Sequence, residues 1–514
     1  MITWIIICLS LAFVWWKVSQ RKFKIFKQKG IPFVPAFPLF GSTWETIVKQ
    51  MPYPEWMLEQ THKFRKNRFF GLSNYGTMTF VVQEPELVKQ LCIKDFENFV
   101  NHPGTTISEH DELLINSLSI LRDQRWKDMR STLSPAFTGS KMRMMFGLVK
   151  ECAEDFVSYI DENLDENGCI ELNTKETYSK VTLDVISSTA FGLKVDSLRD
   201  PENEVYVKAT NAFDIQTFYG QLKLMILQMS PSLGEKFGFS LTKPEFNVFF
   251  KKMIKDTFQQ RRSMKSFRPD IVQLLIQAQD GNLNDDVEDN ETPSNGKKKI
   301  LTDLDLAAQC FIFFFAGSDT TAILLNFCSY ALATNEDVQA KLYEEIQTIR
   351  EKQGDDPITY ENVHQMPYLN AFISEVLRMY PPAFVTDRLC NRATEIVDYN
   401  GSKMQIPEGA HVWFNIYGMH HSHKYFSNPE KFSPERFLPE NKHKLALNAY
   451  MPFGVGPRNC IGSRFALMDA KTVLFSLLSR YKIEVCDKTL VPLRYKAGFG
   501  LVPKSDLIFT FRKR

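Results

Sequence analysis

Apolar residues recur at helical spacing over most of the chain beyond about residue 55. This pattern predicts helices over 142–164, 179–191, 245–262 and 336–351. We expect Asn335 to cap the last of these helices, because an asparagine followed by an acidic first turn is a common helix start.

Strand patterns are short and few. Apolar alternation or short apolar runs at 77–82, 412–414 and 506–511 predict strands. The sequence contains no apparent internal repeat. Because helical patterns dominate and the strands are few, the sequence predicts one large mainly-α domain with a small β region.

A long helix is predicted over 301–333. Its first half is apolar on every side, which indicates either a core helix or a membrane span. The polar residues of 318–321 cut the apolar run short of the length that a span requires, so a core helix is favoured. Within it, the hydroxyl of Thr320 can compete with the backbone hydrogen bonds, and the carboxylate of Asp319 is unfavourable unless it has a partner or a task.

The N-terminus predicts a membrane anchor. Residues 2–16 are almost wholly apolar and a basic stretch follows. A cleaved signal peptide is the alternative, but no positive segment precedes the apolar run, and Trp15 and Trp16 stand where small residues should mark cleavage. We therefore expect an uncleaved anchor over 1–20 with a cytoplasmic body. A basic and proline-rich hinge over 21–54 and a folded body over 55–514 would follow.

Composition narrows the class of protein. The chain is 44% hydrophobic and 24% charged, as in globular proteins, and its formal charge of +2 argues against a nucleic-acid partner. Nine cysteines, an odd number with no Cys-x-x-Cys pair, indicate reduced thiols, and Cys310 and Cys328 are expected to pack in the core. The polar segment 280–299 predicts a solvated, mobile loop.

Cys460 lies in the segment with the most distinctive chemistry. Two glycines and a proline precede it, which suits a tight loop, and a helical pattern follows. A thiol just ahead of a helix, with Arg458 nearby, is expected to favour the thiolate that binds metals. A buried free cysteine at a helix start is the alternative.

This segment resembles the haem-binding loop of the cytochrome P-450 superfamily, Phe-x-x-Gly-x-Arg-x-Cys-x-Gly. Phe453, Gly456, Arg458, Cys460 and Gly462 occupy its fixed positions. The resemblance implies haem b (iron protoporphyrin IX) with Cys460 as axial thiolate, and it places Phe453, Arg458 and Gly462 against the cofactor.

The segment 316–321 of the predicted core helix resembles the acid–alcohol pair of the same family. The resemblance gives Asp319 and Thr320 catalytic roles, with the threonine hydroxyl at the dioxygen site and the acid relaying protons. An ordinary capping or solvent-facing Asp-Thr-Thr cluster fits poorly in the middle of a buried helix.

Further motifs correspond to scaffold and cofactor positions of the family. The resemblance implies a buried ion network of Glu375, Arg378 and Arg436, which serves structure. It also implies propionate contacts from a Trp-x-x-x-Arg pair and two further arginines; a surface cation beside a core tryptophan is the alternative for the pair. The propionate-binding set is Trp126, Arg130, Arg388 and Arg458.

Three neighbouring histidines, His420, His421 and His423, suggest a metal site. The whole segment 419–437 is similar to the loop before Pro-Glu-Arg-Phe in the family, so we expect surface histidines instead.

The resemblance covers nearly the whole chain with its motifs in the family's order, and it is strongest to insect members related to the animal drug-metabolising enzymes. It implies the cytochrome P-450 fold behind an N-terminal anchor, in the endoplasmic reticulum membrane. It also implies a monooxygenase reaction fed by an NADPH-dependent diflavin reductase, with a cytochrome b-type protein as an optional donor. A haem-thiolate isomerase or dehydratase, and a non-catalytic haem carrier or gas sensor, remain alternatives.

The substrate is expected to be a lipophilic small molecule, with xenobiotic or insecticide clearance favoured over a hormone step. Apolar contacts discriminate weakly, so an apolar pocket should tolerate many shapes. Residues 101–121 and 213–250 are expected to close this pocket. Its predicted lining is Phe311, Phe315, Ala316, Ala383 and Phe384.

Overall fold

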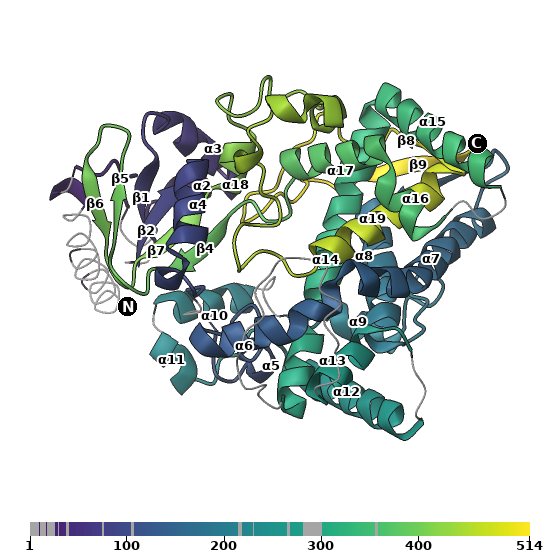
Figure 1. Cartoon of the computed structure of the whole chain (residues 1–514), viewed down its shortest axis with the longest axis horizontal. Helices are drawn as coiled ribbons and strands as arrows, with labels where there is room; N and C mark the ends of the chain where they lie inside the picture. Colours follow the sequence, from purple (N-terminus) through teal and green to yellow (C-terminus); the bar gives the residue numbers. More distant parts are fainter. Residues whose placement is uncertain are drawn as a thin grey trace, which may run out of the picture.

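The computed structural model describes residues 26–514 apart from 29, 38–40, 75–76, 104–106, 214–217, 230, 265–267, 281–300 and 355–357, together with residues 10 and 17. Helices make up most of the described chain, and strands gather into small sheets (Figure 1). The mainly-α prediction is therefore confirmed. The anchor over 1–20 and nearly all of the loop over 280–299 lie outside the described residues.

The predicted helices are present, with shifted ends. Gly139–Glu162, Pro244–Met264 and Glu336–Gln353 are the observed counterparts of three of them. The helices are α2 (Trp44–Val48), α3 (Tyr53–Lys63), α4 (Pro85–Lys89), α5 (Glu112–Ile115), α6 (Asp123–Leu133), α7 (Gly139–Glu162), α8 (Thr174–Ile186), α9 (Glu204–Thr210), α10 (Phe218–Met229), α11 (Pro231–Lys236), α12 (Pro244–Met264), α13 (Ile271–Gln279), α14 (Asp303–Thr334), α15 (Glu336–Gln353), α16 (Tyr360–Gln365), α17 (Pro367–Met379), α18 (Ile416–His420) and α19 (Ser463–Leu478).

Two local expectations are corrected. The helix expected over 179–191 begins at Thr174 as α8, and its last turn is a π-helix, Ser187–Phe191, that ends where Gly192 adopts a left-handed φ of 69°. Asn335 precedes α15 but makes no capping bond, because its side-chain amide instead donates to the carbonyl of Ala331 at the end of α14.

The strand predictions at 77–82, 412–414 and 506–511 are confirmed by β2, β7 and β9. The main sheet has the order β1-β2-β7-β4, in which β7 lies parallel to β2 and antiparallel to β4. The strands are β1 (Phe69–Asn74), β2 (Thr77–Val82), β3 (Cys169–Asn173), β4 (Thr386–Leu389), β5 (Thr394–Val397), β6 (Lys403–Ile406), β7 (His411–Phe414), β8 (Tyr481–Val485) and β9 (Ile508–Lys513).

The described part of the proline-rich segment is extended and packs along β1. Val34 donates its N–H to the carbonyl of Gly71 at 2.9 Å, and Gly71 returns a 2.8 Å bond to Pro32. A Cβ on Gly71 would lie 2.8 Å from the ring of Phe26, so the close approach of this segment requires glycine there.

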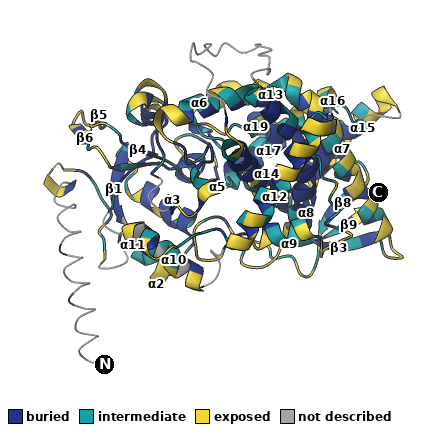
Figure 2. Cartoon of the chain, turned by 90° about the horizontal axis from the view of Figure 1, so that it is seen from below, coloured by how far each residue is buried: buried dark blue, intermediate teal, exposed yellow. Residues whose placement is uncertain are grey.

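Helix α14 is the centre of the core. By length and composition it is the one helix of the described chain that could cross a membrane, but most of its residues are buried against α8, α17 and α19 (Figure 2). Cys310 and Cys328 are fully buried within it, which confirms their predicted packing role. The core-helix prediction is therefore confirmed as well.

Candidate active site

The chain before α19 forms a tight loop around Cys460. Gly454 and Gly456 have φ of 76° and 77°, as predicted for this segment. A Cβ on Gly456 would lie 2.2 Å from the backbone oxygen of Cys92, so this position admits glycine alone. The N–H of Cys460 donates to the carbonyl of Phe453 at 2.8 Å, which closes the loop and sets the cysteine just ahead of the helix.

The thiol of Cys460 is exposed to solvent although protein atoms surround it. Reduced hydration raises its pKa, while a backbone donor at Gly462 and the charge of Arg130 lower it to a smaller degree. A Cβ built on Gly462 would meet nothing within 4 Å, so open space lies beside the cysteine. The expectation that the helix start and Arg458 would favour the thiolate is therefore not met in this structure, where burial outweighs the opposing effects and the cation that acts on the thiol is Arg130.

Arg458 instead holds three backbone carbonyls of a distant segment. Its Nε donates to Val100 at 2.8 Å, and its two terminal nitrogens donate to Leu118 at 3.2 Å and Leu121 at 2.7 Å. The guanidinium carbon also lies 4.0 Å from the centre of the Trp126 ring, a cation–π contact. The conformation of the loop before α6 therefore depends on a side chain from the cysteine loop.

Two more predicted arginines lie near this one. Arg130 on α6 donates to the carbonyl and side-chain oxygens of Asn459, at 2.9 and 2.7 Å. Arg388 on β4 is 1% exposed, donates to the carbonyl of Asp387 at 2.5 Å and lies 5.9 Å from the Phe414 ring. Its Nε is buried and has no hydrogen-bond partner among the described residues.

The three arginines form a cationic cluster, in which the charges of Asp123 and Asp387 only partly offset the burial of Arg458 and Arg388. Burial, followed by repulsion from Arg388 and Arg130, lowers the pKa of Arg458 to about 9, and burial also lowers the pKa of Arg388. Neither Arg388 nor Arg458 forms an ion pair with a carboxylate in the described part of the chain. Buried cations of this kind need a negatively charged ligand.

These residues fit a haem group. A thiol with open space beside it can bind the iron, and the guanidiniums near it suit the two propionates at the edge of the porphyrin. The residues that would hold the group are Trp126, Arg130, Arg388, Phe453, Arg458, Cys460 and Gly462.

The middle of α14 exposes one polar face. Asp319 and Thr320 are exposed, although Ser318 and Thr321 beside them are buried. The Thr320 hydroxyl donates to the carbonyl of Ala316 at 2.7 Å, as expected for a threonine that competes with the helical bonds. Surrounding protein raises the pKa of the Asp319 carboxyl, and the charge of Lys175 partly opposes that shift.

The structure brings Glu375, Arg378 and Arg436 together. Arg378 donates to both oxygens of Glu375 at 2.8 Å, and Arg436 adds a 3.1 Å bond. The backbone N–H of Ser433 supplies a fourth, at 2.9 Å. Glu375 and Arg378 are completely buried.

The expectation of surface histidines is wrong for His420. This imidazole is fully buried, where its Nδ1 lies 3.2 Å from the carbonyl of Arg378 and its Nε2 accepts from the N–H of Met451. His421 is half-buried, and only His423 is exposed, beside Glu430. No cluster of metal-binding side chains occurs here or elsewhere in the described residues.

The predicted pocket residues divide into two groups. Phe311 and Phe384 are 0% and 3% exposed, and Phe311 packs among Phe213, Phe246 and Phe250. Phe315, Ala316 and Ala383 keep exposed surface. The second group can contact a ligand without rearrangement, and Phe311 packs against Phe315 at a ring distance of 5.0 Å.

Sequence reasoning missed several functional candidates. His102 lies 2.7 Å from Asp387 beside Arg388, and Gln309 binds backbone groups of Asn116 and Leu118. Neither residue belongs to a recognisable motif, so only their contacts reveal them.

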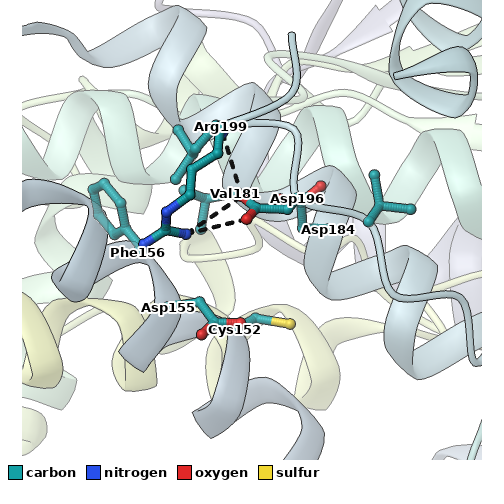
Figure 3. Close-up of a pocket in the computed structure, with 9 residues that line it drawn as sticks. Cys152, Asp155, Phe156, Val181, Asp184, Asp196 and Arg199 are labelled. Atoms are coloured by element: carbon teal, nitrogen blue, oxygen red, sulfur yellow. Dashed lines mark hydrogen bonds and ion pairs between the residues drawn. The ribbon is translucent and has the colours of Figure 1, made fainter. Parts of the chain in front are cut away.

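Figure 3 shows a small hollow between α7, α8 and the chain at 195–199. Arg199 pairs there with Asp196 at 3.2 Å, and Asp184 accepts two bonds from Ser197. Burial raises the pKa of Asp184 to about 7 and that of the Cys152 thiol above its usual value. The hollow contains no residue of the cysteine loop and is separate from the candidate site.

Comparison with known proteins places this geometry in context. The family model for cytochrome P450 matches residues 31–509. Cytochrome P450 9e2 of Blattella germanica is 38% identical, over 93% of this chain and 91% of that protein. Probable cytochrome P450 9f2 of Drosophila melanogaster is 36% identical over 95% and 94%, and cytochrome P450 6a2 of the same fly is 33% identical over 93% and 92%.

Proposed function

The chain belongs to the cytochrome P450 family, and we propose that it oxidises lipophilic small molecules with Cys460 as the protein ligand of its haem iron. Members of this family are generally haem-thiolate monooxygenases. When bound, thiolate-ligated haem activates dioxygen and transfers one of its oxygen atoms to the substrate. The electrons would come from NADPH through a diflavin reductase.

The cationic cluster beside Cys460 carries the proposal. Arg388 and Arg458 are largely buried without a carboxylate partner in the described chain, and Arg130 contacts the residue next to the cysteine. A flat dianionic group that also offers a metal to a thiol satisfies both features, whereas a structural free cysteine leaves the arginines unexplained.

Asp319 and Thr320 are the proposed proton-handling pair. They stand exposed on a helix that is mostly buried, and the raised pKa of Asp319 keeps a proton on its carboxyl at higher pH than usual. The Thr320 hydroxyl donates its single proton to the carbonyl of Ala316. To pass a proton toward the ligand space, the hydroxyl would turn away from that carbonyl and take up a proton from the Asp319 side as it gives one up.

The test supplies the purified protein, a diflavin reductase and NADPH with lipophilic compounds under ¹⁸O₂. We expect one ¹⁸O atom in each product molecule and consumption of NADPH. Cys460→His should abolish the thiolate-type carbon monoxide spectrum. Thr320→Ala should retain haem but divert electrons to peroxide. A thiolate-type spectrum that survives in Cys460→His would remove this cysteine from the proposal.

An isomerase or dehydratase is the second candidate, and the same experiment separates it. Such an enzyme would convert a peroxide without NADPH and without incorporating ¹⁸O. The presence of Asp319 and Thr320 on the exposed face of α14 favours the monooxygenase, because an isomerase has no use for this pair. A haem carrier or gas sensor would bind haem but turn over none of the compounds.

Broad substrate range follows from the pocket chemistry. Phe315, Ala316 and Ala383 offer apolar surface, and such surfaces separate homologues by only about 1–3 kcal/mol per methylene. We therefore expect turnover of several unrelated lipophilic compounds, as in xenobiotic or insecticide clearance. Turnover of a single sterol-like compound at high efficiency would instead indicate a dedicated hormone step.

We place the protein in the endoplasmic reticulum membrane with the body of 55–514 facing the cytoplasm, because the apolar residues 2–16 are followed by a basic stretch. Residues 1–20 would anchor it and 21–54 would connect anchor and body. Deletion of 2–20 should release protein from membranes with its haem content intact. Loss of haem from the released protein would show that the segment supports the body.

A further inference from the structure

Two segments that differ widely in sequence position are joined beside α14. Asp111 is 1% exposed, and its carboxylate accepts bonds from Leu241 N–H at 2.9 Å and from Thr242 N–H at 3.0 Å. The hydroxyls of Ser240 and Thr242 add bonds of 2.5 and 2.6 Å. The chain at 107–121, called here the roof segment, is therefore fixed to the turn that precedes α12.

Gln309 joins the roof segment to the central helix. Its Oε1 accepts from the N–H of Leu118 at 2.8 Å, and its Nε2 donates to the carbonyl of Asn116 at 2.9 Å and to that of Asp305 at 3.2 Å. The side chain is 0% exposed, and all three bonds are to backbone groups. Bonds to backbone atoms fix the register of the segment, because these atoms cannot move away by a change of rotamer.

The stretch 116–121 of the roof segment is also bound by the cysteine loop. The carbonyls of Leu118 and Leu121 accept bonds from Arg458, so this stretch lies between the cysteine loop and α14. Gln309 precedes Ala316 by seven residues, which is about 10 Å along the helix. A shift of the roof segment on α14 would therefore change the space between the exposed face of α14 and the cysteine loop.

Apart from the Asp111 bonds and a 2.8 Å bond from Arg125 to the side chain of Asn116, the contacts near this point permit sliding. The turn before α12 continues into aromatic residues, and Phe246 and Phe250 meet Phe311 at ring distances of 6.1 and 5.8 Å. Apolar ring contacts are non-directional and tolerate small displacements. The ion pair between Arg125 and Asp305 at 2.9 Å is partly exposed, so it adds little.

We infer that Gln309 is a positioning residue that sets the height of the roof segment over the ligand space and thereby selects ligands by size. This inference rests on the proposed haem-thiolate function, because the ligand space is the one beside Cys460. Without the two bonds of Gln309 to Leu118 and Asn116, the roof segment would keep the bonds of Asp111 to 240–242 and those of Arg458. It would lose its direct polar link to α14 at 116–118 and would open there to larger ligands.

The experiment uses the full-length holoprotein. Gln309→Met keeps nearly the same volume and removes all three bonds. Ser329→Ala is the matched control, because it removes a buried 2.7 Å bond between α14 and Tyr178 that does not involve the roof segment. Both variants should retain the thiolate-type carbon monoxide spectrum. If the proposed function is wrong, the unsubstituted protein will itself lack this spectrum, so the two failures can be told apart.

Two readouts that do not depend on turnover decide the matter. Amide hydrogen exchange of residues 116–121 should become at least tenfold faster in Gln309→Met and stay unchanged in Ser329→Ala. Haem spectral titrations give the dissociation constants of imidazole and of the bulkier 4-phenylimidazole. The preference for 4-phenylimidazole over imidazole should rise at least fivefold. This shift should occur only in Gln309→Met.

Either of two results would overturn the inference. Unchanged exchange at 116–121 would mean that Gln309 does not hold the roof segment. Faster exchange with an unchanged ratio of the two dissociation constants would mean that the segment is held by Gln309 but does not select ligands by size.

Discussion

The molecule contains two buried groups of arginines that have opposite environments. Arg378 forms an ion pair with the carboxylate of Glu375, and both side chains are completely buried. Glu375 accepts four hydrogen bonds, two from Arg378 and one each from Arg436 and Ser433. Arg388 and Arg458 are also largely removed from water, but in the described chain their partners are backbone carbonyls and aromatic rings. The first group forms ion pairs within the protein, whereas Arg388 and Arg458 form none within the described chain.

This difference separates a scaffold from a binding site. A buried ion pair that satisfies itself has no remaining capacity for a ligand, and its loss leaves an unpaired charge. A buried cluster of cations without anions is unfavourable in isolation and becomes favourable when a dianion binds. The two groups should therefore respond in opposite ways to mutation: one through the stability of the fold, the other through affinity for the cofactor.

The largest effect is expected at the scaffold. Glu375→Gln removes the charge that pairs with Arg378 and Arg436, and should destabilise the protein by about 3–5 kcal/mol. Urea unfolding followed by tryptophan fluorescence measures this. Glu395→Gln is the control, because its pair with Lys403 is exposed and should contribute at most about 1 kcal/mol. Equal effects of the two substitutions would contradict the distinction.

Arg388→Met should act mainly on the cofactor. The apoprotein should unfold at the same or a higher urea concentration, because a buried unpaired cation is removed. Haem affinity should fall about 10- to 100-fold, equivalent to about 1.4–2.7 kcal/mol. Transfer of haem to apomyoglobin measures the loss. Arg480→Met, which removes an exposed pair with Asp161, should change neither quantity; a large loss of apoprotein stability in Arg388→Met would assign this residue to the scaffold.

Asp469 on α19 tests whether an unpaired buried acid behaves like the unpaired cations. It is 1% exposed, its Oδ1 has no hydrogen-bond partner in the described chain, and burial raises its pKa to about 8. The folded protein therefore keeps a proton that the unfolded chain loses above about pH 4, so stability falls as pH rises from about 4 to about 8.

Asp469→Asn removes this dependence. The variant should exceed the natural protein in stability by roughly 2–4 kcal/mol at pH 8, and the gap should narrow as pH falls toward 4. Urea unfolding at several pH values checks the sign. A gap that widens toward low pH would mean that Asp469 is stabilised as a carboxylate.

Polarity patterns and motif order were enough to predict the mainly-α fold, the central helix and the strands at 77–82, 412–414 and 506–511. They also predicted the tight loop before Cys460. Its Gly454 and Gly456 indeed have the left-handed backbone that only glycine adopts readily. Both kinds of signal are local in the chain.

Long-range contacts set the features that the sequence could not indicate. Arg458 binds carbonyls 337 to 358 residues away, although its neighbourhood suggested a role at the thiol. His420 is buried because Arg378 and Met451 bind it, which its position among other histidines does not reveal. Gln309 stands in an apolar run, and its partners are backbone atoms that carry no sequence signal.

The central claim is that the cationic cluster exists to receive the two carboxylates of haem. Its most direct test is to titrate the apoprotein with haem and with haem dimethyl ester, in which both carboxylates are blocked. The account predicts that the natural protein binds haem at least tenfold more tightly than the ester, and that Arg388→Met loses most of this preference while Glu395→Gln retains it. Equal affinity of the natural protein for haem and its ester would contradict the claim.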